Sequence, residues 1–227
     1  MQINEYILQA WYEKKGMIKY SAHRDIINIF YISLIRAKLP VHYTEGFSKK
    51  PKLSFSPALS LGVSSKREFV NIHLNKEIEI NDGLLKTLND AFPAGINFFR
   101  LQYVSADINK TVEKIKAFKY RCDIEADFEN DDWAAEFIKD KIASIAGCDK
   151  IMVDYNDRLR DIKPYIESCI LISDGPGIIS FSVTTSLIGG SSIKAQLVLN
   201  YILGEYKKNM IYCAGIEKEE IIYREEN

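Results

Sequence analysis

The sequence predicts an α+β protein in which two antiparallel β-sheets each carry helices on one face. Stretches rich in β-branched and aromatic residues recur at the length of a strand. Stretches with apolar residues at three- and four-residue spacing, which is typical of helices, lie between them. The order of these stretches in residues 1–105 is repeated in residues 117–227, so the sequence predicts two units with one topology.

The first half begins with a strand over residues 5–13, where EYILQAWYE is rich in aromatic and β-branched side chains. Apolar spacing predicts a helix over residues 22–38, with Ser21 as its N-cap and Leu39-Pro40 as its end. The remaining elements are extended pieces at 41–44 and 52–56, a strand at 67–74, a helix at 82–92 capped by Asn81, and a strand at 96–105. This β-α-β-β-α-β order is that of the split βαβ, or ferredoxin-like, unit.

The second half has a similar order after a predicted linker at residues 106–116. Its expected elements are a strand at 117–128, a helix at 131–146, an extended region at 160–173, a strand at 178–185, a helix at 192–206 and a strand at 210–223. We therefore expect ferredoxin-like units at residues 1–105 and 117–227. No repeated sequence supports the duplication, which depends on element order alone.

Composition is typical of a soluble globular protein, with 47% hydrophobic and 27% charged residues in a chain of 227. The first residues lack the basic start and apolar run of a secretory signal, and no apolar stretch is long enough to span a membrane. We expect a cytoplasmic protein with no membrane contact.

The four cysteines, at positions 122, 148, 169 and 213, are too far apart in sequence for a zinc knuckle or a redox CxxC pair. No CxxxCxxC triplet is present to hold an iron–sulfur cluster. We expect free, mostly buried thiols, with no metal site and no cofactor.

The most charged part of the chain runs from Lys14 to Arg67, where eleven basic residues face two acidic ones, a net charge of +9. Such a segment indicates a basic surface for a phosphate backbone or an acidic partner, or a solvated face spread over several elements. Two aromatic residues between the basic ones are candidates for stacking on RNA bases. The predicted anion- or RNA-binding residues are Arg24, Arg36, Tyr43, Phe47, Lys49, Lys50, Lys52, Lys66 and Arg67.

His23 is the candidate catalytic residue, as an acid or base, although a structural hydrogen bond is the alternative. Asp25 is two residues away and would diverge from it by about 200° on a regular helix, which disfavours an acid–base pair. The chain contains no GxxxxGK[ST], GxGxxG or GxSxG motif. Since no catalytic set is complete, a non-catalytic role is favoured.

Several segments together resemble the uncharacterised radical SAM-linked protein family, a domain of unknown function found beside or fused to radical SAM proteins. They are His23–Ile26, Ile35–Val41, Tyr43–Phe47, Pro51–Pro57, Leu61–Val63 and Glu68, and Asp161–Pro164 resembles a further family element. The family's N-P-H-P reads Ser48-Lys49-Lys50-Pro51 here, so a histidine is replaced and two lysines are gained. The resemblance implies a radical SAM protein as a partner.

Together these observations predict an accessory module that binds or presents the substrate of a radical SAM enzyme, with RNA as the expected substrate. One alternative is an RNA-processing enzyme of ferredoxin-like fold that uses His23. Another is a protein–protein adaptor whose basic surface meets an acidic partner.

Overall fold

The computed structural model describes the chain except residues 1–5, 106–111, 127–131, 176, 205–210 and 225–227. It divides into an N-terminal unit, Met1–Lys114, and a C-terminal unit, Ile115–Asn227. Each unit combines helices with an antiparallel sheet, which confirms the predicted α+β class. Most of the predicted linker, 106–116, lies outside the described residues, and the first strand of the C-terminal unit begins at its end, at Ile115.

The sheet of the N-terminal unit has the order β4-β1-β3-β2, and every neighbouring pair is antiparallel. Its first strand, β1, therefore lies between β3 and β4 and forms the centre of the unit. The elements are β1 (Tyr6–Lys14), the 3-10 helix η1 (Gly16–Tyr20), α1 (His23–Arg36), β2 (Leu53–Phe55), β3 (Ser64–Leu74), α2 (Asp82–Ala91) and β4 (Ile96–Val104).

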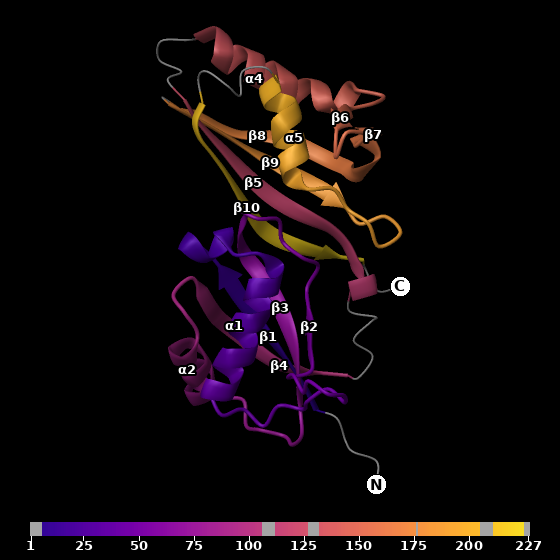
Figure 1. Cartoon of the computed structure of the whole chain (residues 1–227). Coiled ribbons are helices and arrows are strands. Elements are labelled where there is room, and N and C mark those ends of the chain that lie inside the picture. Colours follow the sequence, from indigo (N-terminus) through magenta and orange to yellow (C-terminus); the bar gives the residue numbers. More distant parts are fainter. Residues whose placement is uncertain (1–5, 106–111, 127–131, 176, 205–210, 225–227) are drawn as a thin grey trace. The chain divides into compact units, whose positions relative to one another are not determined.

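Both helices of this unit pack on the same face of the sheet (Figure 1). Alternate residues of β1, namely Leu8, Ala10 and Tyr12, point into the core that α1 and α2 cover, as the period of two in a strand requires. Phe30 of α1 lies 5.1 Å from the Tyr12 ring and 4.8 Å from the Phe92 ring, measured between centroids. These aromatic contacts join the two helices to the central strand.

The helix starts differ in how they are capped. Asn81 caps α2 as predicted, because its side-chain oxygen accepts a hydrogen bond from the Leu84 backbone amide at 2.9 Å. The prediction that Ser21 caps α1 is wrong, since the N-cap is Ala22 and no side chain caps this end. Ser21 instead ends η1, where its backbone amide donates to the Ile18 carbonyl.

The C-terminal unit has the sheet order β10-β5-β9-β8, again antiparallel throughout. Its helix α4 contacts α5 and β8, and α5 contacts β9, so both helices cover one face (Figure 1). The elements are β5 (Ile115–Ala126), α4 (Asp132–Ser144), η2 (Ile145–Gly147), β6 (Met152–Asp154), β7 (Leu159–Asp161), η3 (Lys163–Tyr165), β8 (Ile166–Gly175), β9 (Ile178–Ser186), α5 (Ala195–Leu203) and β10 (Ile211–Tyr223).

The hairpin β6–β7 was not predicted, and the segment at its end, Asp161–Pro164, holds it in place. Asp161 accepts hydrogen bonds from the backbone amides of Ile151 and Lys163, each at 3.0 Å, and these bonds lower the pKa of its carboxyl group. The Lys163 ammonium donates to the Ile145 carbonyl, at the start of η2, at 2.6 Å. This part of the family resemblance therefore has a structural role.

In the part of the chain that the structure describes, no helix is both long enough and apolar enough to cross a membrane.

Gly95, which follows α2, has a φ of +96°, and a Cβ there would collide with the Lys15 carbonyl oxygen. Gly95→Ala should therefore lower the free energy of unfolding by at least about 2 kcal/mol, measured by urea denaturation. Gly147→Ala is the matched control, because nothing lies within 4 Å of its added Cβ. Equal stability of the two variants would contradict the predicted collision of a Cβ at position 95 with the Lys15 carbonyl oxygen.

Candidate functional site

A closed loop carries four of the predicted binding residues. Tyr43 and Pro51 form an isolated antiparallel bridge at its base. Above this bridge, the Thr44 amide donates to the Lys50 carbonyl at 2.8 Å, and the Lys50 amide donates to the Thr44 hydroxyl at 3.2 Å. Phe47, between these anchor points, is fully exposed. We call residues 43–51 the basic loop.

The basic loop lies against α1. The Lys50 ammonium is 5.9 Å from the centroid of the Tyr31 ring, within the range of a cation–π contact. Tyr43 and Lys49 are also exposed. The loop therefore presents two aromatic rings and two lysines close to a third ring on the helix.

The other predicted binding residues do not all join this surface. Arg24 and Arg36 lie at opposite ends of α1, and their separation of twelve positions corresponds to about 18 Å. Arg36 is near α2, since its guanidinium lies 3.5 Å from the Ala91 carbonyl. Lys66 and Arg67 lie near the start of β3.

Lys52 follows the basic loop directly and is tied to its neighbours through its backbone. Its amide donates to the His42 carbonyl at 2.7 Å, and its carbonyl accepts from the His73 amide at 3.2 Å. These bonds fix the chain on the β2 side of the loop.

A small cavity of about 20 Å³ lies in the N-terminal unit at the start of α1. This volume holds about one water molecule. It brings together residues from separate segments of the family resemblance, namely His23, Phe55, Ser56 and Glu68. The remaining lining residues are Tyr12, Lys14, Ile26, Ala58 and Leu59.

Four polar residues of this cavity are almost completely buried: Tyr12, Lys14, Ser56 and Glu68. The Ser56 hydroxyl donates to the Glu68 carboxylate at 2.5 Å and accepts from the Phe69 amide at 3.4 Å. These bonds orient the carboxylate. Burial, and then the negative charge of Glu68, raise the pKa of Tyr12 well above its usual value, so its hydroxyl keeps its proton.

The Tyr12 hydroxyl, on a side chain that is only 4% exposed, has no hydrogen-bond partner among the described residues. The same holds for the imidazole of His23, the first residue of α1, which is exposed and meets the Phe55 ring edge-on at 5.7 Å. In the part of the chain that the structure describes, the buried Oε1 atom of Glu68 also accepts no hydrogen bond. The cavity thus has a hydroxyl inside and an imidazole at its mouth.

Sequence reasoning identified His23 but not Tyr12 or Lys14. The sequence does contain a sign that Lys14 is buried. Alternate positions of β1 are occupied by Leu8, Ala10, Tyr12 and Lys14, and only the last of these is charged. A lysine that continues the inward row of a strand indicates a buried charge. Among the described residues, no group of three histidine, cysteine, aspartate or glutamate side chains is placed to hold a metal ion.

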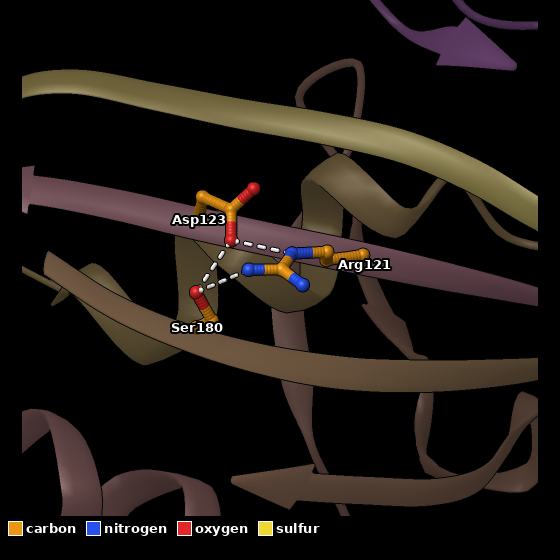
Figure 2. Close-up of polar contacts among 3 residues, drawn as sticks. All are labelled: Arg121, Asp123 and Ser180. Atoms are coloured by element: carbon orange, nitrogen blue, oxygen red, sulfur yellow. Dashed lines mark hydrogen bonds and ion pairs between the residues drawn. The ribbon is translucent and has the colours of Figure 1, made fainter. Parts of the chain in front are cut away.

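In the C-terminal unit, Arg121, Asp123 and Ser180 form a polar cluster between β5 and β9 (Figure 2). The Arg121 guanidinium donates to Asp123 at 2.9 Å and to Ser180 at 3.1 Å, while Ser180 donates to Asp123 at 2.6 Å. The bond to Asp123 raises the pKa of Arg121. The two bonds of Ser180 link β9 to β5, and the two charges are paired with each other.

The described thiols, Cys122, Cys148 and Cys169, are free. Only Cys122 is fully buried and the other two are partly buried, so the expectation of mostly buried thiols holds for one of the three. Burial raises the pKa of Cys169 to about 12 and raises that of Cys122 as well. Neither therefore supplies a thiolate near neutral pH. The side chain of Cys213 lies outside the described residues.

A bacterial protein family described as an uncharacterised conserved protein, DUF2344, matches residues 8–196, more than four fifths of the chain. The chain belongs to this family. DUF2344 extends well beyond residue 105, so both units contribute to it. Its description gives no activity and no partner.

No curated protein matches the chain. Among solved structures, a Cbf5-Nop10-Gar1 complex contains a chain that is 9% identical, with a TM-score of 0.47 over 93% of this chain. The match covers 48% of that chain, so this DUF2344 protein spans about half its length.

Two further structures are less similar. An unknown protein from Galdieria sulphuraria is 13% identical, with a TM-score of 0.26 over 96% of this chain and 100% of that one. A putative monooxygenase from Fusobacterium nucleatum subsp. nucleatum is 10% identical, with a TM-score of 0.29 over 97% and 94% of the two chains. Because all three sequence identities are low and all three TM-scores are below 0.5, these similarities indicate nothing about function.

Tyr12 and Tyr103 provide a matched pair of tyrosines in the N-terminal unit. The Tyr103 hydroxyl donates to the Ile78 carbonyl at 2.9 Å and accepts from its amide at 2.8 Å. Tyr103→Phe should lower the free energy of unfolding by about 1 kcal/mol, whereas Tyr12→Phe should leave it unchanged or raise it by up to about 1 kcal/mol. Urea denaturation of both variants checks this, and a larger loss for Tyr12→Phe would show that its hydroxyl is satisfied within the fold.

Proposed function

We propose that this DUF2344 protein is a cytoplasmic accessory module that binds RNA, through the basic loop and α1, and presents it to a radical SAM enzyme. The observation that carries the proposal is the fully exposed Phe47 beside Lys49 and Lys50, on a loop closed by backbone hydrogen bonds. The partner enzyme would carry the chemistry, since the chain has no CxxxCxxC motif.

We also propose that both units are ferredoxin-like. In each unit, the first strand lies between the third and the last, and the second pairs with the third at the sheet edge. This counts β8 and β9 as the second and third strands of the C-terminal unit and leaves its hairpin β6–β7 as an insertion. The order and the antiparallel pairings are those of a split βαβ unit.

Charge supports an anionic ligand for the N-terminal unit. This unit has 16 basic and 11 acidic residues, a net charge of +5, while the C-terminal unit has 14 basic and 20 acidic residues, a net charge of −6. A phosphate backbone is attracted by the first charge and repelled by the second. The RNA contact is therefore proposed on the N-terminal unit alone.

Exposed aromatic rings support single-stranded RNA as the ligand. A phenylalanine that is fully exposed gains nothing from the protein core, but a base can cover its ring. The Tyr31 ring, held near Lys50, offers a second flat surface. Lysines beside such rings neutralise the phosphates between stacked bases.

The first test is Phe47→Ala, measured by fluorescence anisotropy with a single-stranded RNA of about ten nucleotides. Loss of one stacking contact should weaken binding by about 1–3 kcal/mol at every salt concentration. Because Phe47 is fully exposed, the variant should unfold at the same urea concentration as the wild type. If wild-type protein shows no binding at low salt, the proposal fails.

The second test is the pair Lys49→Ala/Lys50→Ala, titrated with salt. Loss of two phosphate contacts to a single strand should reduce the slope of log K against log salt by about 1.4. Lys76→Ala/Lys86→Ala removes the same charge from exposed positions outside the loop and is the matched control. Equal slopes for the two double variants would remove the basic loop from the RNA contact.

A further inference from the structure

We propose that two copies of this chain pair through the edge strand β8, antiparallel to each other, and extend the sheet of the C-terminal unit across a two-fold axis. This interaction surface lies outside the residues proposed to bind RNA and goes beyond that function. Either proposal can therefore fail without the other.

The unpaired side of β8 is the observation that carries the inference. This strand ends the sheet order β10-β5-β9-β8, so only β9 pairs with it in the part of the chain that the structure describes (Figure 1). Apart from its ladder with β9, β8 makes no backbone hydrogen bond with other described residues. Residues 170–174 are all exposed. The backbone groups on this side are thus open to another strand.

The middle of β8 lacks the features that usually keep an edge strand from pairing, such as a charge, a proline or a short length. The strand has 10 residues, and the stretch from Ser168 to Ser173 contains neither a charge nor a proline. In contrast, β4 at the edge of the N-terminal sheet has the exposed Arg100 at its centre. The middle of β8 instead has three exposed apolar residues, Ile170, Leu171 and Ile172.

The three apolar residues lie on both faces of the sheet. Ile170 pairs with Ser182 and lines a groove of about 440 Å³, and Ile172 lines the same groove. Leu171 pairs with the buried Phe181 and points to the other face, as alternation in a strand requires. A strand that adds to this edge would therefore cover apolar side chains on both faces.

The ladder between β8 and β9 is irregular at two positions. Glu167 and Ile172 are skipped in the register, so neither has a partner residue on β9. Bulges of this kind can bend an edge away from other strands. Between them, the stretch from Ser168 to Leu171 pairs regularly with β9. The regular stretch includes the centre of the apolar group, and Ile172 has backbone groups that β9 does not pair in register.

The sequence of β8 suits a second copy of itself. Residues opposite each other in an antiparallel pair lie on the same face of the sheet, so a two-fold axis must pass through a residue. An axis at Leu171 places this residue opposite its own copy, and places Ile170 opposite Ile172 of the second copy. All three apolar residues then meet apolar residues in cross-strand pairs, which stabilise a sheet. Such an isologous contact closes at two copies.

The same register keeps the acidic residues of β8 apart. With the axis at Leu171, Asp174 lies opposite Ser168 of the second copy. Glu167 likewise lies opposite Gly175. No two carboxylates therefore face each other across the contact.

Both acids also have a basic partner in their own chain. Lys139 lies 3.2 Å from Asp174, and Lys116 lies 4.0 Å from Glu167. Acidic residues of the C-terminal unit that are more than about 8 Å from the contact are screened at physiological salt. The whole chain has a net charge of only −1, so two copies repel each other weakly.

Analytical ultracentrifugation of the full chain tests for the dimer, which the wild type should form between about 1 and 100 μM. Ile172→Lys should raise the dissociation constant by about tenfold or more, because each dimer then has two lysines opposite Ile170. Ile188→Lys is the matched control, since Ile172 and Ile188 are both 48% exposed and Ile188 lies outside β8. A wild type that stays monomeric, or equal dimerisation of the two variants, would overturn the inference. Phe47→Ala, which tests the RNA contact, should dimerise like the wild type.

Hydrogen exchange of the backbone amides shows whether β8 is the contact. Residues 170–173 should exchange more slowly at about 100 μM than at about 1 μM, whereas β4 should exchange equally at both concentrations. If the chain dimerises while exchange in β8 is independent of concentration, the copies meet at another surface and the inference fails. It also fails if the chain is monomeric and β8 is protected only when a radical SAM partner is added, because the edge then receives a strand of that partner.

Discussion

The N-terminal unit depends on the packing of one fully buried side chain, Phe30 of α1. Its ring meets the rings of Tyr12 on β1 and Phe55 on β2 at 5.1 Å, Phe92 after α2 at 4.8 Å and Phe98 on β4 at 6.0 Å. One residue thus joins α1 to three strands and to the end of the other helix. Because it fixes α1, it also fixes where the helix begins, at the cavity, and where Tyr31 meets the basic loop.

The cavity lies where the inward row of β1 changes from apolar to charged. Leu8 and Ala10 pack under the helices, Tyr12 brings an aromatic ring with a hydroxyl, and Lys14 ends the strand with a buried charge. Buried ionic groups contribute less stability than well-packed apolar side chains of the same volume, because each loses its hydration. A fold selected for stability alone would continue the apolar row.

The sequence predicted local elements, but it could not show which side chains meet in the fold. Periodicity is local, so it located α1, α2 and the central strands, and side-chain chemistry identified the Asn81 cap. The predicted cap at Ser21 was wrong, because η1 extends to Tyr20 and α1 therefore begins one residue later than expected. The cavity depends on the pairing of Tyr12 with Glu68 in the sheet, and on the placement of β2 beside β3. Neither is a local property of the chain, so His23 could be singled out without the residues around it.

The basic loop and α1 together determine what kind of contact this surface can make. The loop is exposed and basic, so its contacts would be numerous, weak and sensitive to salt. The Tyr31 ring, in contrast, belongs to a helix that Phe30 anchors in the core, and it lies 5.9 Å from the Lys50 ammonium. A ligand that stacks on Phe47 and also reaches Tyr31 would gain affinity, because its second contact is intramolecular. A single base could not make both contacts, so the surface would favour a strand over a free nucleotide.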